Sequence, residues 1–368
     1  MRDKRIVLTL DAGGTNFVFS AVDSSGEVIS PVRLPAETKD LNKSLQTITS
    51  GFEQAIEKSP RPPVAISFAF PGPADYPSGI IDNVGNLPAF AGGVALGPYL
   101  QWQFGLPTFI NNDGDLFAYG EAIAGLLPDV NKQLELAGSK KRYRTLFAIT
   151  LGTGLGGGLV HNGELFIGDN SNASEVWLLR NRLRPECFAE EGACIRAVRG
   201  SYAKHANISF DDSPTPQQIA AMAKDTGEAT NQHAAIQAYL ELGQVVGGAL
   251  ANAITLLDGL VVIGGGISGA YELFMQPLLD EMQGKIETYD GKPISRIMQR
   301  VFNLQCNQQR AVFMEGATRT LTIPGSKKEI TYDPMKRIGI GITRLGTSRA
   351  ISIGAHAFAI HQIDKAVA

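Results

Sequence analysis

The sequence has few of the features that mark secreted, nucleic-acid-binding or membrane proteins. Three cysteines among 368 residues are an odd number, which argues against the disulfide framework of a small secreted protein. Charged residues make up only 19% and the net charge is −3, whereas capture of nucleic acid needs a basic surface. No apolar run looks long enough to cross a membrane, and the N-terminal residues lack a signal-peptide pattern. We therefore expect a cytoplasmic protein that contacts neither nucleic acid nor membranes.

Glycine, in contrast, is abundant, with 41 residues clustered in short runs. Three apolar runs predict strands that empty into glycine-rich turns: Ile6–Leu10, Thr145–Leu151 and Leu260–Ile263. Backbone N–H groups in such turns can surround phosphate oxygens. One such turn would be typical of an ordinary hairpin, but three indicate a phosphate or nucleotide site. The turns lack the P-loop pattern, and a strand follows residues 152–157, so a dinucleotide fingerprint is not expected either.

The remaining pattern predicts mixed helices and strands in two domains or one large one. Apolar residues at helical spacing predict helices over residues 41–56, 116–127, 217–257 with a break near Asp225, and 350–360. Strand, glycine turn and strand occur twice, which is a weak internal duplication. Alternation around a Pro-Gly-Ser turn predicts a β-hairpin insert within residues 317–344.

The order of these motifs resembles the superfamily of sugar kinases, heat-shock cognate proteins and actin. More specifically it is similar to the ROK family, which contains sugar kinases and sugar-responsive repressors. Two motifs are similar to the phosphate loops of the family: Asp11-Ala12-Gly13-Gly14-Thr15 to the first and Gly152-Thr153-Gly154 to the second. Gly264-Gly265-Gly266 is similar to the adenosine loop, and Gly354-Ala355 before the last helix is similar to the second connecting segment. The sugar motifs are Pro71-Gly72-Pro73 with Gly85-Asn86-Leu87-Pro88, Asn112-Asp113 with Gly120-Glu121, and Gly168 through Ala173-Ser174-Glu175. The resemblance covers nearly the whole chain.

The resemblance implies a role for each candidate site residue. Phosphoryl transfer to a hydroxyl needs a carboxylate that accepts the proton, and Asp113 takes that role, although such a residue can also be a helix cap. Asp11 is implied to hold Mg²⁺ through water, although it can also be a turn former. Asn86, Asn112 and Glu175 offer donors and acceptors for sugar hydroxyls. ATP would be held by Gly13, Gly14, Thr15 and the two later glycine loops.

The segment from Cys187 to Cys194 departs from the family pattern. Family members build a zinc site from one histidine and three cysteines, and here Ala189 and Leu178 stand at two of the four ligand positions. Structural zinc sites use four ligands, so we expect no zinc and two reduced thiols. Arg196 stands where the family has a glutamate that contacts the sugar, so the sugar pocket is altered as well.

The expected fold is α/β, a two-lobed actin-like ATPase (ribonuclease H-like) fold with mixed sheets and ATP in the interlobe cleft. The small lobe would comprise residues 1–118 plus 351–368, and the large lobe residues 119–350. The expected function is an ATP-dependent sugar kinase that uses ATP and Mg²⁺, with glucose as the best single substrate and N-acetylhexosamines next. The alternative is a catalytically weak sugar-binding regulator without a DNA-binding domain, since Asp11 leaves no room for one before it. The resemblance also implies a homodimer.

Overall fold

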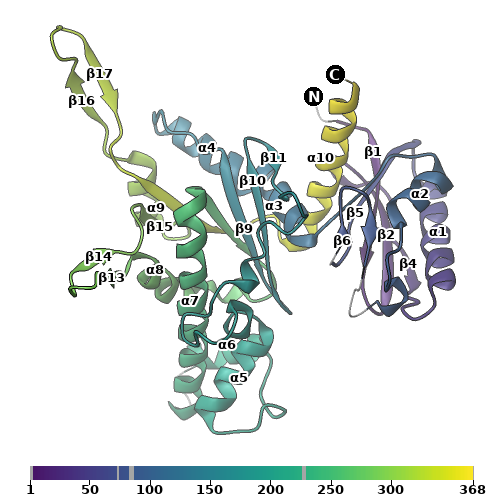
Figure 1. The fold of residues 1–368 in the computed structure, drawn as a ribbon, viewed down its shortest axis with the longest axis horizontal. Helices are drawn as coiled ribbons and strands as arrows, with labels where there is room; N and C mark the ends of the chain where they lie inside the picture. Colours follow the sequence, from purple (N-terminus) through teal and green to yellow (C-terminus); the bar gives the residue numbers. More distant parts are fainter. Residues whose placement is uncertain (1–2, 73, 83–86, 226–228, 368) are drawn as a thin grey trace. The chain divides into compact units, whose positions relative to one another are not determined.

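A computed structural model describes residues 3–72, 74–82, 87–225 and 229–367 of the chain. The chain divides into two compact units (Figure 1). Unit 1 comprises Met1–Gly125, Gly158–Ala173 and Leu345–Ala368, and unit 2 comprises Leu126–Gly157 and Ser174–Arg344. The division by lobes made from the sequence stays a prediction. The contacts place residues 158–173 in unit 1, whereas the sequence assigned them to the large lobe.

Unit 1 is an α/β unit built on one sheet. That sheet contains β1 (Ile6–Ala12), β2 (Asn16–Asp23), β3 (Gly26–Glu27), β4 (Val32–Pro35), β5 (Pro63–Ala69) and β8 (Thr108–Asn111). The short strands β6 (Ala74–Asp75) and β7 (Ile80–Ile81) pair with each other, and β11 (Glu164–Leu165) pairs with β10 (Leu155–His161). The helices of unit 1 are α1 (Leu41–Lys58), the 3₁₀ turn η1 (Pro88–Phe90), α2 (Leu96–Phe104), α3 (Asp113–Ile123) and α10 (Thr347–Val367). The order β3-β2-β1-β5-β8 makes β1, β5 and β8 neighbouring parallel strands, while β2 runs antiparallel to β1.

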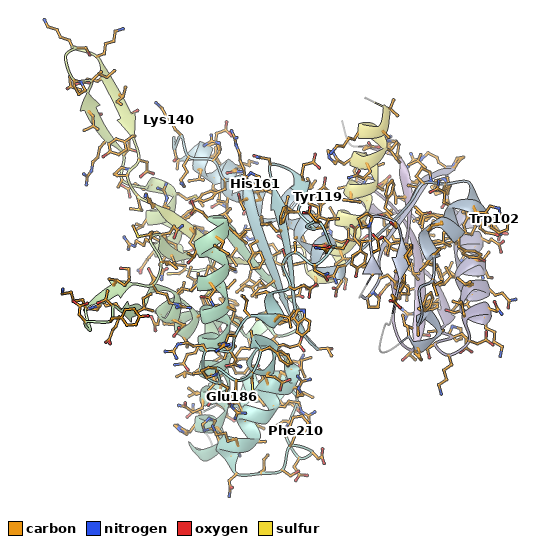
Figure 2. The ribbon with its side chains drawn as sticks, in the orientation of Figure 1. Trp102, Tyr119, Lys140, His161, Glu186 and Phe210 are labelled. Atoms are coloured by element: carbon orange, nitrogen blue, oxygen red, sulfur yellow. The ribbon has the colours of Figure 1, made fainter. Side chains whose placement is uncertain are left out.

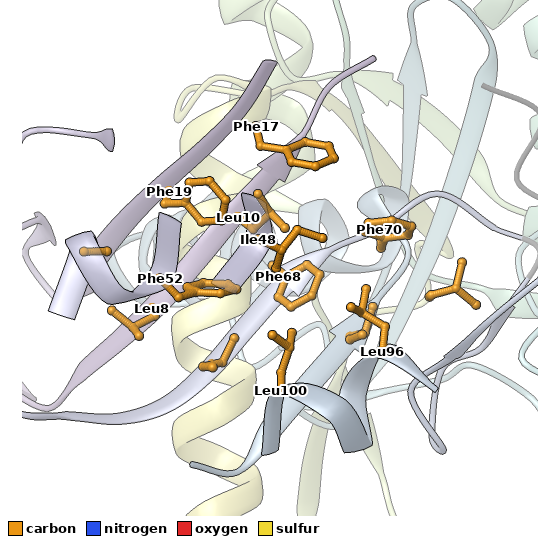
Figure 3. Packing of buried hydrophobic residues seen from close by; sticks show 14 of the residues in the cluster. Leu8, Leu10, Phe17, Phe19, Ile48, Phe52, Phe68, Phe70, Leu96 and Leu100 are labelled. Atoms are coloured by element: carbon orange, nitrogen blue, oxygen red, sulfur yellow. The ribbon is translucent and has the colours of Figure 1, made fainter. Parts of the chain in front are cut away.

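Both faces of this sheet are covered by helices. On one face α1 buries Ile48 and Phe52 in a cluster with Phe19 and Phe68 of the sheet (Figure 3). The rings of Phe19 and Phe52 meet edge to face with centroids 5.1 Å apart, a preferred geometry for aromatic pairs. A side chain at position 51 would overlap the Phe19 ring, so α1 can pack this closely only with a glycine there. The other face packs against α10, where Ala359 and Ile360 join Val7, Val22 and Ala65.

Helix α10 also crosses α3 at very short range. A Cβ atom at Gly354 would overlap the carbonyl oxygen of Leu116, and one at Gly120 would overlap that of Ala350. Glycine at both positions therefore lets the two backbones touch. The prediction that Gly354 precedes the last helix is wrong, because α10 begins at Thr347 and encloses it. Polar contacts tie the same helix to the first strand: His356 Nε2 lies 3.0 Å from the Arg5 carbonyl oxygen, and Arg5 pairs with Asp364 at 2.6 Å.

Unit 2 has a second sheet, in the order β11-β10-β9-β12-β18-β15. Its strands are β9 (Thr145–Leu151), β10 (Leu155–His161), β12 (Leu260–Gly264), β13 (Lys285–Glu287), β14 (Pro293–Ser295), β15 (Arg300–Asn303), β16 (Arg319–Thr322), β17 (Glu329–Tyr332) and β18 (Arg337–Ile342). Its helices are α4 (Leu126–Leu136), α5 (Ile195–Ala206), α6 (Pro216–Lys224), α7 (Ala229–Leu257), α8 (Tyr271–Gln283) and α9 (Asn307–Glu315), with 3₁₀ turns η2 (Val176–Leu178), η3 (Ala189–Gly192) and η4 (Ser268–Ala270). Strands β9, β12, β18 and β15 are parallel in turn, and the division between the units falls within β10, after Gly157.

Helix α7 corrects one expectation from the sequence. Its span Asn231–Leu257 is long and apolar enough to cross a membrane by length and composition alone, with a mean hydropathy of 1.4. The helix packs against α5, α6 and α8, however, and 56% of that apolar window is buried inside the protein. Gly243 and Gly247 face the backbone of α8 with no room for a side chain. These contacts are those of a core helix, which passes the same composition test.

The expected hairpin insert forms, but it is shorter than predicted. β16 and β17 pair antiparallel, with Leu321 opposite Ile330, and the hairpin projects from unit 2 (Figure 1). Residues 337–342 are instead the buried strand β18 of the main sheet. Lys140, labelled in Figure 2, donates to the Thr331 hydroxyl at 3.1 Å and supports one face of the hairpin.

The base of this hairpin is closed by an ion pair between a fully buried arginine and a partly buried aspartate. Asp333 Oδ1 accepts hydrogen bonds from the backbone N–H groups of Ala317 at 3.1 Å and Met335 at 3.0 Å, one on each side of the hairpin. Its other oxygen accepts from Arg337, whose side chain is fully buried. The Arg337 guanidinium also lies 5.5 Å from the centre of the Phe313 ring. The hairpin therefore leaves the unit through a fixed neck.

Two further elements differ from their predictions. The helix predicted over residues 116–127 is two helices, α3 and α4, because the chain turns at Ala124–Gly125, where Gly125 lies against the Glu121 side chain. The apolar run Val28–Val32 also predicts a strand, whereas the structure has the short strand β3 just before this run and β4 from Val32 onward. Pro31 lies just before β4, and proline has no N–H group for a strand ladder.

Candidate active site

In unit 1 the candidate residues collect at one edge of the sheet. The parallel register places Asp11 of β1 beside Ala69 of β5, and Ala69 beside Asn111 of β8. The carboxyl ends of these three strands therefore meet at one edge, which is where open α/β sheets bind ligands. Asp11 and the Asn112-Asp113 pair leave this edge two strands apart, about 10 Å at the usual strand spacing.

Asp113 is the first residue of α3, and the cap of that helix is its neighbour. The Asn112 side chain accepts a hydrogen bond from the Gly114 N–H at 2.8 Å, so Asn112 is the N-cap. The Asp113 carboxylate accepts from the same N–H at 2.8 Å and stays open to solvent. Crowding by the surrounding protein disfavours the charged form and raises the pKa of Asp113, against the pull of the backbone hydrogen bond. The side chain itself is exposed, so solvent still reaches the carboxylate.

The first glycine turn joins β1 to β2 as the sequence predicts. Asp11, near the end of β1, has an exposed side chain, and a carboxylate in this position suits Mg²⁺, which prefers oxygen ligands and keeps several waters. Gly13 lies against the Asn16 carbonyl oxygen, only 2.9 Å from where a Cβ atom would be. Gly14 has open space around it, and the Thr15 carbonyl accepts from Ala36 at 3.0 Å. The turn therefore leaves backbone N–H groups uncovered by side chains.

The predicted sugar-contact stretch is only partly described. Asn86, which the sequence assigns to the sugar, lies outside the described residues. Next to that stretch, the Tyr76 hydroxyl donates to the Phe70 carbonyl at 3.0 Å and is approached by the Asn112 amide at 3.5 Å. Gly72 lies against the same hydroxyl. Tyr76 thus organises this edge, and no sequence pattern had singled it out.

In unit 2 the other two glycine loops are neighbours. Gly152-Thr153-Gly154 joins β9 to β10. Gly264 is the last residue of β12, which is paired with β9 in parallel, and Gly265-Gly266 follow it. Gly265 has a φ of +85° and lies against the backbone of Leu151, where a side chain has no room. The Ile267 N–H donates to the Leu151 carbonyl at 3.0 Å. The two loops therefore lie side by side at one glycine-rich edge of the sheet. Loops that bind the same nucleotide have to be neighbours in this way.

A mostly apolar cavity opens beside the second of these loops. It has a volume of about 340 Å³ and lies between α6, α7 and η4. Gly266, Ile267 and Ala270 line one side, and Tyr239 with Pro216 lines the other. Flat apolar slots of this kind, next to backbone N–H groups, are typical of small-molecule sites.

A larger cavity of about 800 Å³ lies between α5, α7 and the segment before η3, and Arg196 lines it. Its charges are largely used within the protein, since Arg196 pairs with Glu191 at 2.5 Å. Glu241 accepts from Ser201 at 2.7 Å and lies 2.8 Å from His205 Nε2.

Glu175, the predicted sugar contact in unit 2, begins a well-ordered segment. Its carboxylate accepts a hydrogen bond from the Trp177 indole, and the Trp177 ring meets Phe188 edge to face with centroids 5.6 Å apart. Leu178, at the position of the family's histidine, is 58% exposed. An exposed leucine has no side-chain group that could donate a hydrogen bond, so Leu178 departs from the pattern that the sequence resembles.

The cysteine segment is held by hydrogen bonds. Asn181 is buried, and its Oδ1 accepts from the backbone N–H groups of Leu183 at 2.9 Å and Arg184 at 3.1 Å. Cys187 and Cys194 are free thiols, and burial raises the pKa of Cys194. Among the residues that the structure describes, no three His, Cys, Asp or Glu side chains gather at a distance suited to a metal ion. The expectation that no zinc binds here stays a prediction.

Comparison with known proteins places the chain in a family. The model of the ROK family matches residues 7–312. Two relatives in sequence are a glucokinase from Thermotoga maritima, 25% identical over 75% of this chain and 86% of the relative, and an N-acetyl-D-glucosamine kinase from Photobacterium profundum, 29% identical over 73% and 86%.

Solved structures agree with that assignment. The crystal structure of a glucokinase from Parabacteroides distasonis matches with a TM-score of 0.90 and 47% identity over 98% of both chains. A ROK family glucokinase from Streptomyces griseus, solved in complex with glucose and AMPPNP, matches with a TM-score of 0.59 over 96% of this chain and 98% of that one; at 19% identity it shows the fold alone. The chain therefore belongs to the ROK family and has the actin-like α/β fold of its sugar kinases.

Proposed function

We propose that this ROK-family sugar kinase transfers the γ-phosphoryl group of ATP to a hydroxyl of a hexose, with glucose as substrate and Asp113 as general base. The observation that carries the proposal is the start of α3. Asn112 supplies the helix cap, so the Asp113 carboxylate is left at the sheet edge with one face open to solvent. Its raised pKa makes it a better proton acceptor than an ordinary aspartate, as a base for a hydroxyl requires.

The backbone supports ATP as the phosphate donor. The loops 13–15, 152–154 and 264–266 present N–H groups beside glycines, which suits phosphate oxygens. The apolar cavity beside Gly266 has the size and lining to hold a purine base. Asp11 fits a role in holding Mg²⁺ through water, and the ion when bound would neutralise phosphate charge.

Glucose is proposed as the sugar because the 47% identical Parabacteroides distasonis protein is a glucokinase. N-acetylglucosamine is the second candidate, since relatives such as the Photobacterium profundum protein act on it by name. The exposed Leu178 and the Arg196–Glu191 pair leave two sugar-contact positions of the family pattern without their usual side chains. Contacts from Asn112, Glu175 and Asn86 would then carry more of the sugar recognition.

The test is ADP release with ATP and Mg²⁺ against hexoses, N-acetylhexosamines and sugar acids. We expect turnover on glucose and a fall in kcat of about 10²–10⁴-fold in Asp113→Asn, the usual range for loss of a general base. Glu53→Gln, an exposed carboxylate on α1, is the matched control and should keep wild-type kcat. Folded wild-type protein that binds ATP yet turns over no sugar would instead favour a sugar-binding regulator.

A further inference from the structure

The second phosphate loop receives a carboxylate from another part of unit 2. Glu190 Oε2 accepts a hydrogen bond from the backbone N–H of Leu155 at 2.9 Å. A Cβ atom at Gly154 would lie only 2.5 Å from the same oxygen. A side chain on the third residue of the loop would therefore collide with Glu190 where it lies, and a glycine avoids that collision. The carboxylate is committed to a backbone donor directly after Gly152-Thr153-Gly154.

The same segment also holds the other end of the loop. The Ile195 N–H donates to the Gly152 carbonyl at 2.8 Å, and within the loop the Gly152 N–H donates to the Gly154 carbonyl at 3.0 Å. The loop therefore has two anchoring hydrogen bonds. The Gly152 carbonyl at its first residue accepts from Ile195, and the N–H of Leu155, the residue after its last, donates to Glu190. Backbone that is anchored in this way keeps its free N–H groups pointing in a fixed direction.

Glu190 is itself delivered by an ordered element. It lies in η3, where Ala189 is fully buried and donates its N–H to the Leu179 carbonyl at 2.6 Å. The Glu190 carbonyl accepts from Ala193 at 3.0 Å, and the Asn181 N–H donates to the Cys187 carbonyl at 2.9 Å. The position of the carboxylate is thus set by the backbone of residues 179–193, which also connects it to the segment that begins at Glu175.

We propose that Glu190 is a positioning residue that holds the phosphate loop 152–154 in its binding conformation. It acts through the Leu155 N–H and does not touch the nucleotide. The inference rests on the proposed function, in which the loop 152–154 binds the phosphates of ATP. Glu190 would hold that loop ready for them. A neutral acceptor of the same shape can accept the same hydrogen bond, so the role depends on the acceptor oxygen and not on the negative charge.

The kinetic test compares Glu190→Ala with Glu190→Gln. We expect Glu190→Ala to raise the KM for ATP about tenfold while the KM for the sugar stays within about twofold, since only the phosphate loop loses its hold. Glu190→Gln should restore the KM for ATP to near the wild-type value. Glu186→Ala removes an exposed carboxylate from the same segment (Figure 2) and should change neither constant.

A second readout does not depend on catalysis. In ligand-free protein, amide hydrogen exchange at Leu155, resolved by NMR, should be at least about tenfold faster in Glu190→Ala than in wild type and near wild type in Glu190→Gln. Unchanged exchange in Glu190→Ala would overturn the proposal. A lower KM for ATP in both variants would also overturn it, because the carboxylate would then be competing with phosphate. If the wild-type protein phosphorylates no sugar, the exchange pattern together with ATP affinity by calorimetry still decides the role of Glu190.

Discussion

Removal of the Asp333 carboxylate should cost far more stability than removal of any exposed charge on the hairpins. Asp333 closes the neck of the β16–β17 hairpin and is the acid partner of Arg337, whose side chain is fully buried. In Asp333→Ala the guanidinium would stay buried without its counter-charge. Two of its nitrogens, Nε and Nη2, already lack a hydrogen-bond partner among the described residues.

The expected loss follows from those contacts. Breaking one partner of a buried ion pair costs about 3–5 kcal/mol, because an uncompensated charge remains in the interior. The Phe313 ring stacks on Tyr143 with centroids 5.7 Å apart and lies 5.5 Å from the Arg337 guanidinium, and the Arg337 side chain has no exposed surface. We therefore expect the free energy of unfolding of unit 2 to fall by about 3 kcal/mol or more.

The pH dependence has a definite sign. Burial by itself would raise the pKa of Asp333, but the hydrogen bonds from Arg337 and from two backbone N–H groups outweigh it and hold the pKa below its ordinary value. The stabilisation is therefore complete above the unfolded-state pKa of about 3.9 and is lost as pH falls through the lower folded-state value. In Asp333→Ala this part of the acid destabilisation should be missing.

Urea unfolding at neutral pH and again below pH 4 tests this reasoning. Asp290→Ala, which removes an exposed acid paired with Lys292 on the β13–β14 hairpin, is the control and should leave the free energy of unfolding close to the wild-type value. The double variant Asp333→Ala, Arg337→Met should be more stable than Asp333→Ala alone, because no charge is left buried. A loss below about 1 kcal/mol in Asp333→Ala would refute the argument.

Two further predictions concern packing and assembly. Gly354→Ala should lower the free energy of unfolding by about 2 kcal/mol or more, because its Cβ would overlap the Leu116 carbonyl oxygen. Gly200→Ala in α5, whose Cβ would meet only the Phe210 ring at 4.0 Å, should raise it by up to about 1 kcal/mol. If urea unfolding showed the same change for both variants, the close crossing of α3 and α10 would be contradicted. The chain should sediment as a homodimer with about twice the mass of its 39.3 kDa, since the pairs Ile286–Ile294 and Leu321–Ile330 leave exposed apolar faces on two hairpins; a single species at the mass of one chain would contradict this expectation.

The sequence predicted the strands that carry the glycine turns because apolar runs and glycines are local signals. Thr145–Leu151 forms as predicted, and the runs beginning at Ile6 and Leu260 extend only slightly beyond their predictions. Two helix boundaries were wrong. The break at Gly125 lies against the Glu121 side chain one turn earlier, a contact that the apolar pattern does not encode, and α10 already begins at Thr347, where Ala350 meets Gly120 of α3.

Of the candidate site, the sequence could name residues but not their supports. Asn112 and Asp113 are adjacent, and only the geometry of the first turn shows which one caps the helix. Tyr76 and Trp177 orient site residues through single hydrogen bonds. Glu190 reaches Leu155 from a point distant in the chain, and a pair of this kind leaves no local pattern in one sequence.

The position of α10 has a consequence for synthesis of the protein. Unit 1 begins with the first strand, yet one face of its sheet is covered by the last helix, through Ala359 and Ile360 against Val7 and Val22. On the ribosome the first strands emerge long before that helix exists, so their apolar face must stay uncovered until residues 347–367 have been synthesised. Unit 2 contains no residue beyond Arg344 and can complete its core earlier. A chaperone that binds nascent apolar strands would therefore meet unit 1, and loss of the last helix by a late stop codon would expose the beginning of the chain.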